Sequence, residues 1–346
     1  MINKHILKLS YPEYGGAKDK NIKLDLSTSE NPVKLKFKSN IDFSGYSFSQ
    51  DPELIEKISF QCRANPKNIL LTAGCDGALH HIAETLIDTC DEVLIPCPSF
   101  GRYEYHTKVL KGKPLFLHFD KFPFEFRIDK IIMEIQRKRP KLVFIANPNN
   151  PTGHYLEKEK IIQLLENAKE TYIVLDEALI DYLGEENSCA DLIEQYPNLI
   201  VTRSFSKLYG MAGLRLGYML ANENLITEIA KTVSPFEVNN YAIDIAKQAL
   251  GDIEHKKMSR EIVKSGLDVL RQSGIKITDT QTAIALICEE NIYEYLKDHG
   301  IMTVSGENFR GLDKNCARVC IKDTEIMKKV IKVLNQKLKI QSLCFP

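Results

Sequence analysis

The chain has 346 residues, of which 44% are hydrophobic and 27% charged, as in an ordinary globular protein. Lys and Arg together number 46, as do Asp and Glu, so no net charge directs the chain to nucleic acid or to an anionic membrane. No apolar run approaches the roughly 20 residues of a membrane span, and residues 1–10 lack a signal-peptide core. We therefore expect a cytoplasmic protein, and the length favours two domains.

The nine cysteines are scattered along the chain without the paired spacing of a zinc site, so we expect no metal. In a reducing compartment, an odd number of cysteines predicts free and mostly buried thiols. Cys75 is the exception to follow, because it lies in a turn that we expect to form part of a ligand site.

From about residue 68 to 220, short apolar runs rich in β-branched residues alternate with helical patterns. The first run, 68–72, predicts a strand, and a helix follows through Leu86. The later runs predict further strands at 92–96, 142–146, 172–176, 199–202 and 215–220. Continuous apolar strands separated by helices indicate a mainly parallel sheet covered on both faces, which is an α/β architecture.

After Ser234 and Pro235 the pattern changes. It predicts two long helices, two strands of a second sheet and a terminal amphipathic helix, at 242–250, 259–272, 283–288, 317–321 and 325–337. We therefore place a large domain at 45–235 and a smaller α/β domain at 236–346, with the N-terminal segment 1–44 packed on the smaller one.

In an open α/β sheet, ligands bind at the carboxyl ends of the strands, so polar residues after the predicted strands are candidates. Asp176 ends an otherwise apolar strand, where it could cap a helix or pair with a protonated ring nitrogen. Lys207 follows the next strand and is either a surface lysine or a Schiff-base lysine with a depressed pKa. Arg215, flanked by Gly and Leu, can be partly buried only beside an anion such as a phosphate monoester.

Two further turns and one aromatic residue belong to the same group of candidates. Cys75 and Asp76 lie in a strand-to-helix turn whose small residues and free N–H groups suit an anion, although many α/β turns look similar. Asn150, in a rigid turn rich in Pro and Asn, could donate to a phenolate oxygen or could serve the turn alone. Phe100 is either a core aromatic or a plate stacked on a flat heterocycle.

These motifs, in this order, resemble the fold-type-I pyridoxal phosphate (PLP) enzymes of the aspartate aminotransferase superfamily, class I and II. The matching segments are 150–153, 176–178 and 204–207, followed by Arg215, and the key residues are separated by 26, 31 and 8 positions. Each motif alone is weak, whereas the ordered set is specific. The resemblance extends over residues 24–334, and it implies PLP as the cofactor and a large domain with a seven-stranded, mainly parallel sheet.

The resemblance also implies a role for each candidate. Lys207 would form the Schiff base and act as general acid and base, and Asp176 would pair with the pyridinium nitrogen. Tyr46 looks like the tyrosine that such enzymes contribute to the partner subunit's cofactor, which implies a homodimer with shared active sites. The other cofactor contacts would come from Asn150 to the ring oxygen, Phe100 against the ring, and the backbone of Cys75 and Asp76 with Ser204, Ser206 and Arg215 around the phosphate.

Within the superfamily, the chain most resembles the branch that holds histidinol-phosphate aminotransferase and threonine-phosphate decarboxylase. Segment 26–32, which includes Asn31, resembles both enzymes, and Arg318 looks like the arginine that binds the substrate carboxylate. Three features favour the decarboxylase: the motifs at 308–313 and 318–322, the start Tyr14-Gly15-Gly16, and Leu179 in place of a tyrosine.

The chain departs from this pattern at Tyr14, which replaces a histidine, and at Val304, which stands where both enzymes usually have an arginine. Segments 204–207 and 210–213 are more similar to the aminotransferase. Tyr14 and Asn31 remain candidate substrate contacts together with Arg318.

Our first hypothesis from the sequence is the decarboxylation of a small amino-acid O-phosphate, L-serine or L-threonine phosphate, to an amino-alcohol phosphate. The alternative is an aminotransferase that acts on a small phosphorylated substrate with glutamate. A third hypothesis is a non-catalytic protein that uses the fold for binding. It is disfavoured because Lys207, Asp176 and Arg215 are all present.

Overall fold

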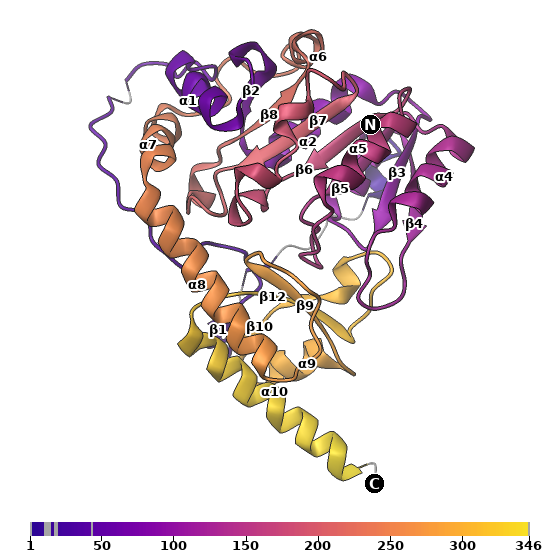
Figure 1. The fold of residues 1–346 in the computed structure, drawn as a ribbon, viewed down its shortest axis with the longest axis vertical. Coiled ribbons are helices and arrows are strands. Elements are labelled where there is room, and N and C mark those ends of the chain that lie inside the picture. Colours follow the sequence, from indigo (N-terminus) through magenta and orange to yellow (C-terminus); the bar gives the residue numbers. More distant parts are fainter. Residues whose placement is uncertain (1, 10–14, 17–19, 43, 345–346) are drawn as a thin grey trace.

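The structure is a computed structural model, and it describes residues 2–9, 15–16, 20–42 and 44–344, with side chains up to residue 338. Figure 1 shows a larger part built around a central sheet and a smaller part that carries the C-terminal helix. None of the described helices is long and apolar enough to cross a membrane. The cytoplasmic location stays a prediction.

The central sheet has seven strands in the order β2-β8-β7-β6-β5-β3-β4. Only β8 runs antiparallel to its neighbours, so the predicted mainly parallel α/β sheet is confirmed. Sequence analysis missed β4, because this edge strand is only half-buried and includes a proline. The strands are β2 (Ile69–Thr72), β3 (Glu92–Cys97), β4 (Lys113–His118), β5 (Leu142–Ala146), β6 (Tyr172–Asp176), β7 (Leu199–Ser204) and β8 (Gly217–Ala221).

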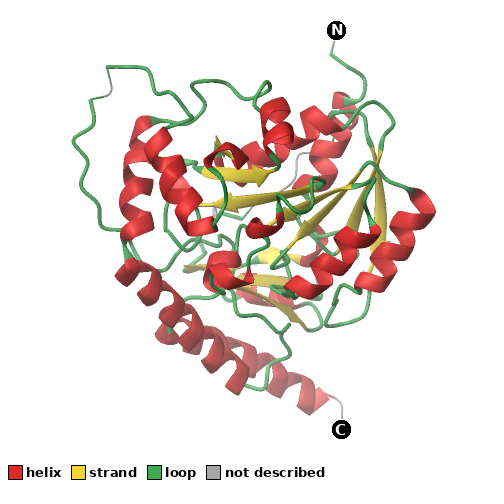
Figure 2. Cartoon of the chain, turned by 45° about the horizontal axis from the view of Figure 1, so that its top comes forward, coloured by secondary structure: helices red, strands yellow, loops and turns green. Residues whose placement is uncertain are grey.

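Helices cover both faces of this sheet (Figure 2). Successive residues of one strand point to opposite faces, and in β5 Val143 and Ile145 enter one apolar cluster while Leu142 and Phe144 enter another. The first face packs against α1 (Pro52–Cys62), α4 (Ile128–Lys138), α5 (Lys158–Asn167) and α7 (Asn240–Gly251). The second packs against α2 (Gly74–Leu86), α3 (Arg102–Val109) and α6 (Glu223–Ile229).

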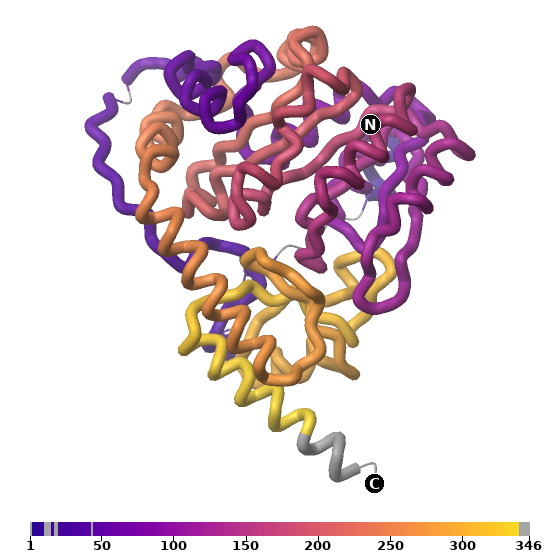
Figure 3. Tube along the Cα trace, in the orientation of Figure 1, coloured from indigo at the N-terminus to yellow at the C-terminus, as the bar shows by residue number. Residues whose placement is uncertain are grey.

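The smaller part has its own apolar cluster. Its antiparallel sheet has the order β11-β12-β9, and the long helices α8 and α10 pack side by side (Figure 1). The N-terminal chain, indigo in Figure 3, reaches this part through β1 (Leu24–Asp25), which pairs with β10 (Ile301–Met302). The domain boundaries at 45 and 235 stay predictions. The remaining elements are α8 (Ile253–Gln272), β9 (Ile284–Cys288), α9 (Ile292–Asp298), β11 (Val304–Ser305), β12 (Cys316–Cys320) and α10 (Thr324–Cys344).

Two cysteines differ from the sequence expectation of free thiols. Cys288 on β9 and Cys316 on β12 lie opposite each other in the antiparallel register and form a disulfide. The expectation was wrong for this pair because 28 residues separate the two cysteines, and only the strand register brings them together. Six other cysteines of the described chain are free: Cys62, Cys75, Cys90, Cys97, Cys189 and Cys320.

A buried ion cluster connects β7 to the loop that follows β6. Arg203, with 0% of its surface exposed, donates to Asp181 at 2.7 Å and to Glu185 at 2.9 Å. A charge removed from water is tolerated only when it is paired and hydrogen-bonded. Arg203 therefore fixes the segment that starts beside Asp176.

We predict that Arg203→Ala destabilises the protein by about 3–5 kcal/mol, because it leaves the buried Asp181 without its counter-charge. Urea denaturation followed by circular dichroism measures the change. The control is Arg137→Ala, which removes an exposed pair with Glu134 and should cost at most about 1 kcal/mol. Equal losses for the two variants would contradict the importance of the cluster.

Candidate active site

Three adjacent parallel strands, β5, β6 and β7, end at the same edge of the sheet and carry three of the predicted residues there. Asn150 follows β5, Asp176 is the last residue of β6, and Lys207 follows β7. All three line a cavity of about 300 Å³. Seven further predicted site residues line it as well: Cys75, Asp76, Phe100, Ser204, Ser206, Arg215 and Arg318.

Asp176 is a buried carboxylate that three donors hold in place. Tyr103 donates its hydroxyl to Oδ2 at 2.8 Å, while the backbone N–H of Ala178 at 3.1 Å and the hydroxyl of Thr202 at 3.4 Å reach Oδ1. Burial raises the pKa of Asp176, and these donors oppose that shift. Sequence analysis missed Tyr103, because it lies in a helix 73 residues before its acceptor.

Lys207 is enclosed in the cavity, and its ammonium group donates to the hydroxyl of Ser29. Burial lowers the pKa of Lys207 to about 8, and the charge of Arg318 adds to this shift. At that pKa, roughly one amine in ten is neutral at pH 7. Lys207 can therefore act both as a nucleophile and as a proton carrier near neutral pH.

The first turn of α2 and Arg215 form a cradle for an anion. The first N–H groups of a helix have no partner within it, and at the start of α2 no side chain caps them. Gly74 has φ +80°, which other residues rarely adopt, and a Cβ there would lie 2.9 Å from the guanidinium of Arg215, so glycine lets the arginine approach without a shift. Ser204 and Ser206 lie beside this cradle in the cavity wall. Such a set suits a phosphate group.

Arg318 and Asn150 lie on the other side of the cavity and contact each other. Arg318 donates to the amide oxygen of Asn150 at 3.0 Å and to the carbonyl of Ser27 at 2.5 Å. Burial lowers the pKa of Arg318 to about 10, and its Nε has no hydrogen-bond partner among the described residues. The guanidinium is thus held at a fixed position while its Nε–H is left to donate. Because the amide oxygen of Asn150 is engaged, its Nδ2 group remains to donate to a ligand.

The N-terminal segment supplies part of the wall that sequence analysis missed. Ser27, Thr28, Ser29 and Glu30 line the cavity. The resemblance of segment 26–32 to related enzymes could have indicated these residues, but from it we selected only Asn31 as a candidate. In three of the four missed residues the only polar side-chain group is a hydroxyl. Serine and threonine are common, and their spacing here does not single out a site.

Asn31 does not line the cavity. Its amide donates to the carbonyl of Leu208 at 2.5 Å and to the hydroxyl of Ser259 at 2.9 Å. Asn31 therefore anchors the N-terminal segment behind the loop that carries Lys207. Tyr14 lies outside the described residues.

Tyr46 lies apart from the cavity on the surface. It is 82% exposed, and its ring centroid lies 5.0 Å from that of Phe236. Phe48 and Phe236 are exposed beside it, with their ring centroids 5.6 Å apart. These three residues form an exposed aromatic cluster.

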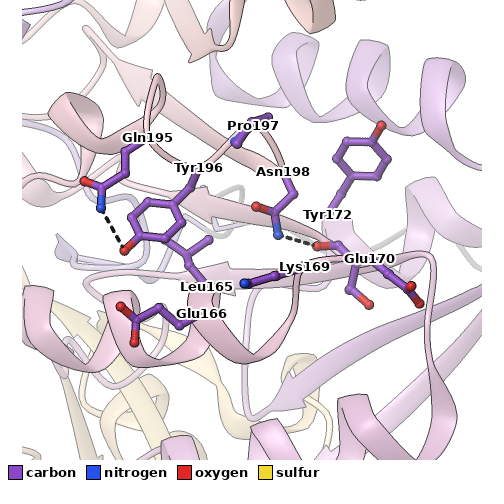
Figure 4. Close-up of a pocket in the computed structure, with 10 residues that line it drawn as sticks. Leu165, Glu166, Lys169, Glu170, Tyr172, Gln195, Tyr196, Pro197 and Asn198 are labelled. Atoms are coloured by element: carbon purple, nitrogen blue, oxygen red, sulfur yellow. Dashed lines mark hydrogen bonds between the residues drawn. The ribbon is translucent and has the colours of Figure 1, made fainter.

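A second pocket, of about 680 Å³, lies at the amino ends of β6 and β7, opposite the first (Figure 4). Its charged side chains, Glu166, Lys169 and Glu170, are exposed to solvent. The cavity around Lys207, by contrast, is lined by buried ionisable groups with shifted pKa values, which favours it as the site of chemistry.

Comparisons with known proteins identify the family of the chain. The model of the family "Aminotransferase class I and II" matches residues 5–334. Histidinol-phosphate aminotransferase of Methanosarcina barkeri is 31% identical over 324 residues, which cover 89% of this chain and 87% of that protein.

Two solved structures share the fold. Histidinol-phosphate aminotransferase from Sinorhizobium meliloti, in complex with pyridoxal-5′-phosphate, has a TM-score of 0.83 at 19% identity and covers 99% of this chain and 98% of that one. L-threonine-O-3-phosphate decarboxylase from Porphyromonas gingivalis has a TM-score of 0.75 at 23% identity and covers 91% and 98%. At these identities the two likenesses show the fold alone.

We predict that Lys207 of the ligand-free protein reacts with an amine-directed acylating reagent in proportion to its neutral fraction. Its labelling rate should rise with pH, reach half of its maximum near pH 8 and level off at higher pH, because burial lowers its pKa to about 8. Peptide mapping by mass spectrometry measures the rate, with a free lysine derivative as the control, whose ordinary pKa is about 10.4. A profile for Lys207 that follows this control would contradict the shift.

Proposed function

Because the chain belongs to the aminotransferase class I and II family, whose enzymes depend on pyridoxal phosphate, we propose that it transfers an amino group to a small phosphorylated substrate. Glutamate is the amino donor in this proposal. The family resemblance and the cofactor predicted from the sequence are confirmed by the family match.

The residues of the cavity fit this cofactor. The cradle at the start of α2 suits its phosphate, and the buried carboxylate of Asp176 suits its protonated ring nitrogen. Lys207 would supply the amine for the aldehyde group, and the Nδ2 group of Asn150 would supply a donor for the ring oxygen. These roles, with Phe100 against the ring, are proposals that rest on the positions of the side chains.

When bound, pyridoxal phosphate supplies an electron sink for the substrate's α-carbon. Lys207 would take the proton from that carbon and deliver it to the cofactor carbon that carried the aldehyde, for which its depressed pKa is suited. Asp176 keeps its ionised form beside the ring nitrogen, which its three donors favour. Arg318, fixed by Asn150 and Ser27, binds the anionic group of each substrate in turn.

The observation that carries the proposed reaction is the 31% identity to a histidinol-phosphate aminotransferase over most of both chains. The likeness to a threonine-phosphate decarboxylase, at 23% identity, concerns the fold alone. The decarboxylase reaction that we expected first from the sequence therefore has less support than its alternative.

We predict that glutamate alone converts the bound cofactor to its amine form, seen as loss of the visible absorbance, without release of CO₂. The assay adds glutamate, serine phosphate and threonine phosphate separately to the holoprotein and measures absorbance and CO₂ in parallel. Lys207→Arg keeps the charge but cannot carry the proton, and should slow the conversion by about 10²–10⁴-fold or more. CO₂ from either amino-acid phosphate, with no response to glutamate, would establish the decarboxylase instead.

We also propose that the protein is a homodimer in which Tyr46 reaches the partner subunit's cofactor phosphate. The exposed aromatic cluster of Tyr46, Phe48 and Phe236 supports this proposal, because large exposed apolar side chains that gather on a surface mark interaction sites. An interface between two identical subunits uses the same surface twice.

We predict that two inactive variants, Lys207→Ala and Tyr46→Ala, restore activity when their subunits are mixed by refolding. A hybrid dimer then contains one site with both residues, so activity should reach about a quarter of the wild-type value. Each variant refolded alone serves as the control. If Tyr46 acts within its own subunit, the mixture stays as inactive as its components.

A further inference from the structure

Asp76 presents an electrostatic problem for the proposed phosphate cradle. It lies in the first turn of α2, where its backbone N–H belongs to the cradle, and it lines the cavity. A carboxylate in the first turn stabilises a helix, but it also repels a second anion that binds at the same end. The cradle therefore requires that the charge of Asp76 be neutralised.

The structure provides this neutralisation through α3. Arg102 donates two hydrogen bonds to the carboxylate, from Nε to Oδ1 at 2.5 Å and from a terminal nitrogen to Oδ2 at 2.7 Å. Nε2 of His106, one turn further along α3, lies 3.1 Å from Oδ1. The Arg102 side chain is 11% exposed and the Asp76 side chain 42% exposed, so solvent screens this pair only in part.

Of the two partners, only Arg102 brings a formal charge. Burial lowers the pKa of His106, and Nδ1 of this histidine has no hydrogen-bond partner among the described residues. His106 is thus neutral and donates from Nε2. Burial alone would raise the pKa of Asp76, but the hydrogen bonds from His106 and Arg102 outweigh it and hold this pKa at about 2.

The second carboxylate near this helix end is engaged in the same way. Glu237 accepts the backbone N–H of Ala73 at 2.7 Å, and Nε2 of His81 lies 2.7 Å from its other oxygen. Two acids at the amino end of α2 thus each have a basic partner, whereas Arg215 faces the cradle itself.

We propose that Arg102 is a positioning residue for the cofactor: it holds the Asp76 carboxylate against α3 and cancels its charge, so that the start of α2 accepts a phosphate group. This inference rests on the proposed binding of the cofactor phosphate at α2. Arg102 acts through Asp76. Its removal therefore harms phosphate binding only while residue 76 is charged.

The test measures the dissociation constant of pyridoxal phosphate for the apoprotein by absorbance titration, without any substrate. Arg102→Ala should weaken binding about tenfold, in line with the effect of one unit charge at a helix end. The double variant Asp76→Asn with Arg102→Ala should bind nearly as tightly as the wild type. Pyridoxal, which lacks the phosphate, should bind all of these proteins equally.

Arg127→Ala is the matched control, because Arg127 makes a similar two-bond pair with Asp129 on the exposed start of α4. The single variant Asp76→Asn, with Arg102 intact, tests the proposal even if Arg102→Ala does not fold. It should bind pyridoxal phosphate at least as tightly as the wild type. The proposal is overturned if the double variant is as weak as Arg102→Ala, if pyridoxal binding falls equally, or if Asp76→Asn alone weakens binding. If the protein catalysed a decarboxylation and not an amino-group transfer, the ratios between the dissociation constants of these variants and of the wild type would be the same.

Discussion

The burial of the Lys207 amine at the carboxyl end of β7 is the constraint on which the site depends. A lysine in bulk water is almost fully protonated at neutral pH, whereas removal from water, together with the charge of Arg318, lowers the pKa of Lys207 to about 8. The sheet provides one side of this enclosure. The N-terminal segment and β12 provide the other, through Ser29, whose hydroxyl meets the amine, and through Arg318.

The same constraint explains why the smaller part must pack closely against the larger one. Arg318 comes from β12, yet its guanidinium is fixed by Asn150 after β5 and by Ser27 in the N-terminal segment. These contacts join three distant regions of the chain at one cavity. Charged groups that do not serve the chemistry, such as Arg203 with Asp181, are instead paired within the scaffold.

The sequence predicted the strand ends of the sheet and the residues that follow them, because buried parallel strands are apolar throughout and a polar residue at their end is conspicuous. Asn150, Asp176 and Lys207 were found in this way, and the cavity contains all three. Tyr103 and Arg102 of α3 were missed because their partners are set by packing that no local pattern encodes: Tyr103 meets Asp176 at the end of β6, and Arg102 meets Asp76 on α2. The disulfide between Cys288 and Cys316 was missed for a similar reason, since it depends on strand register.

We propose that Lys207 forms the covalent bond to pyridoxal phosphate. Borohydride reduction of the purified holoprotein, followed by peptide mapping with mass spectrometry, tests it most directly, because reduction makes the bond between lysine and cofactor permanent. We expect a phosphopyridoxyl group on the peptide that contains Lys207. A label on another lysine, or no label after incubation with the cofactor, would contradict it.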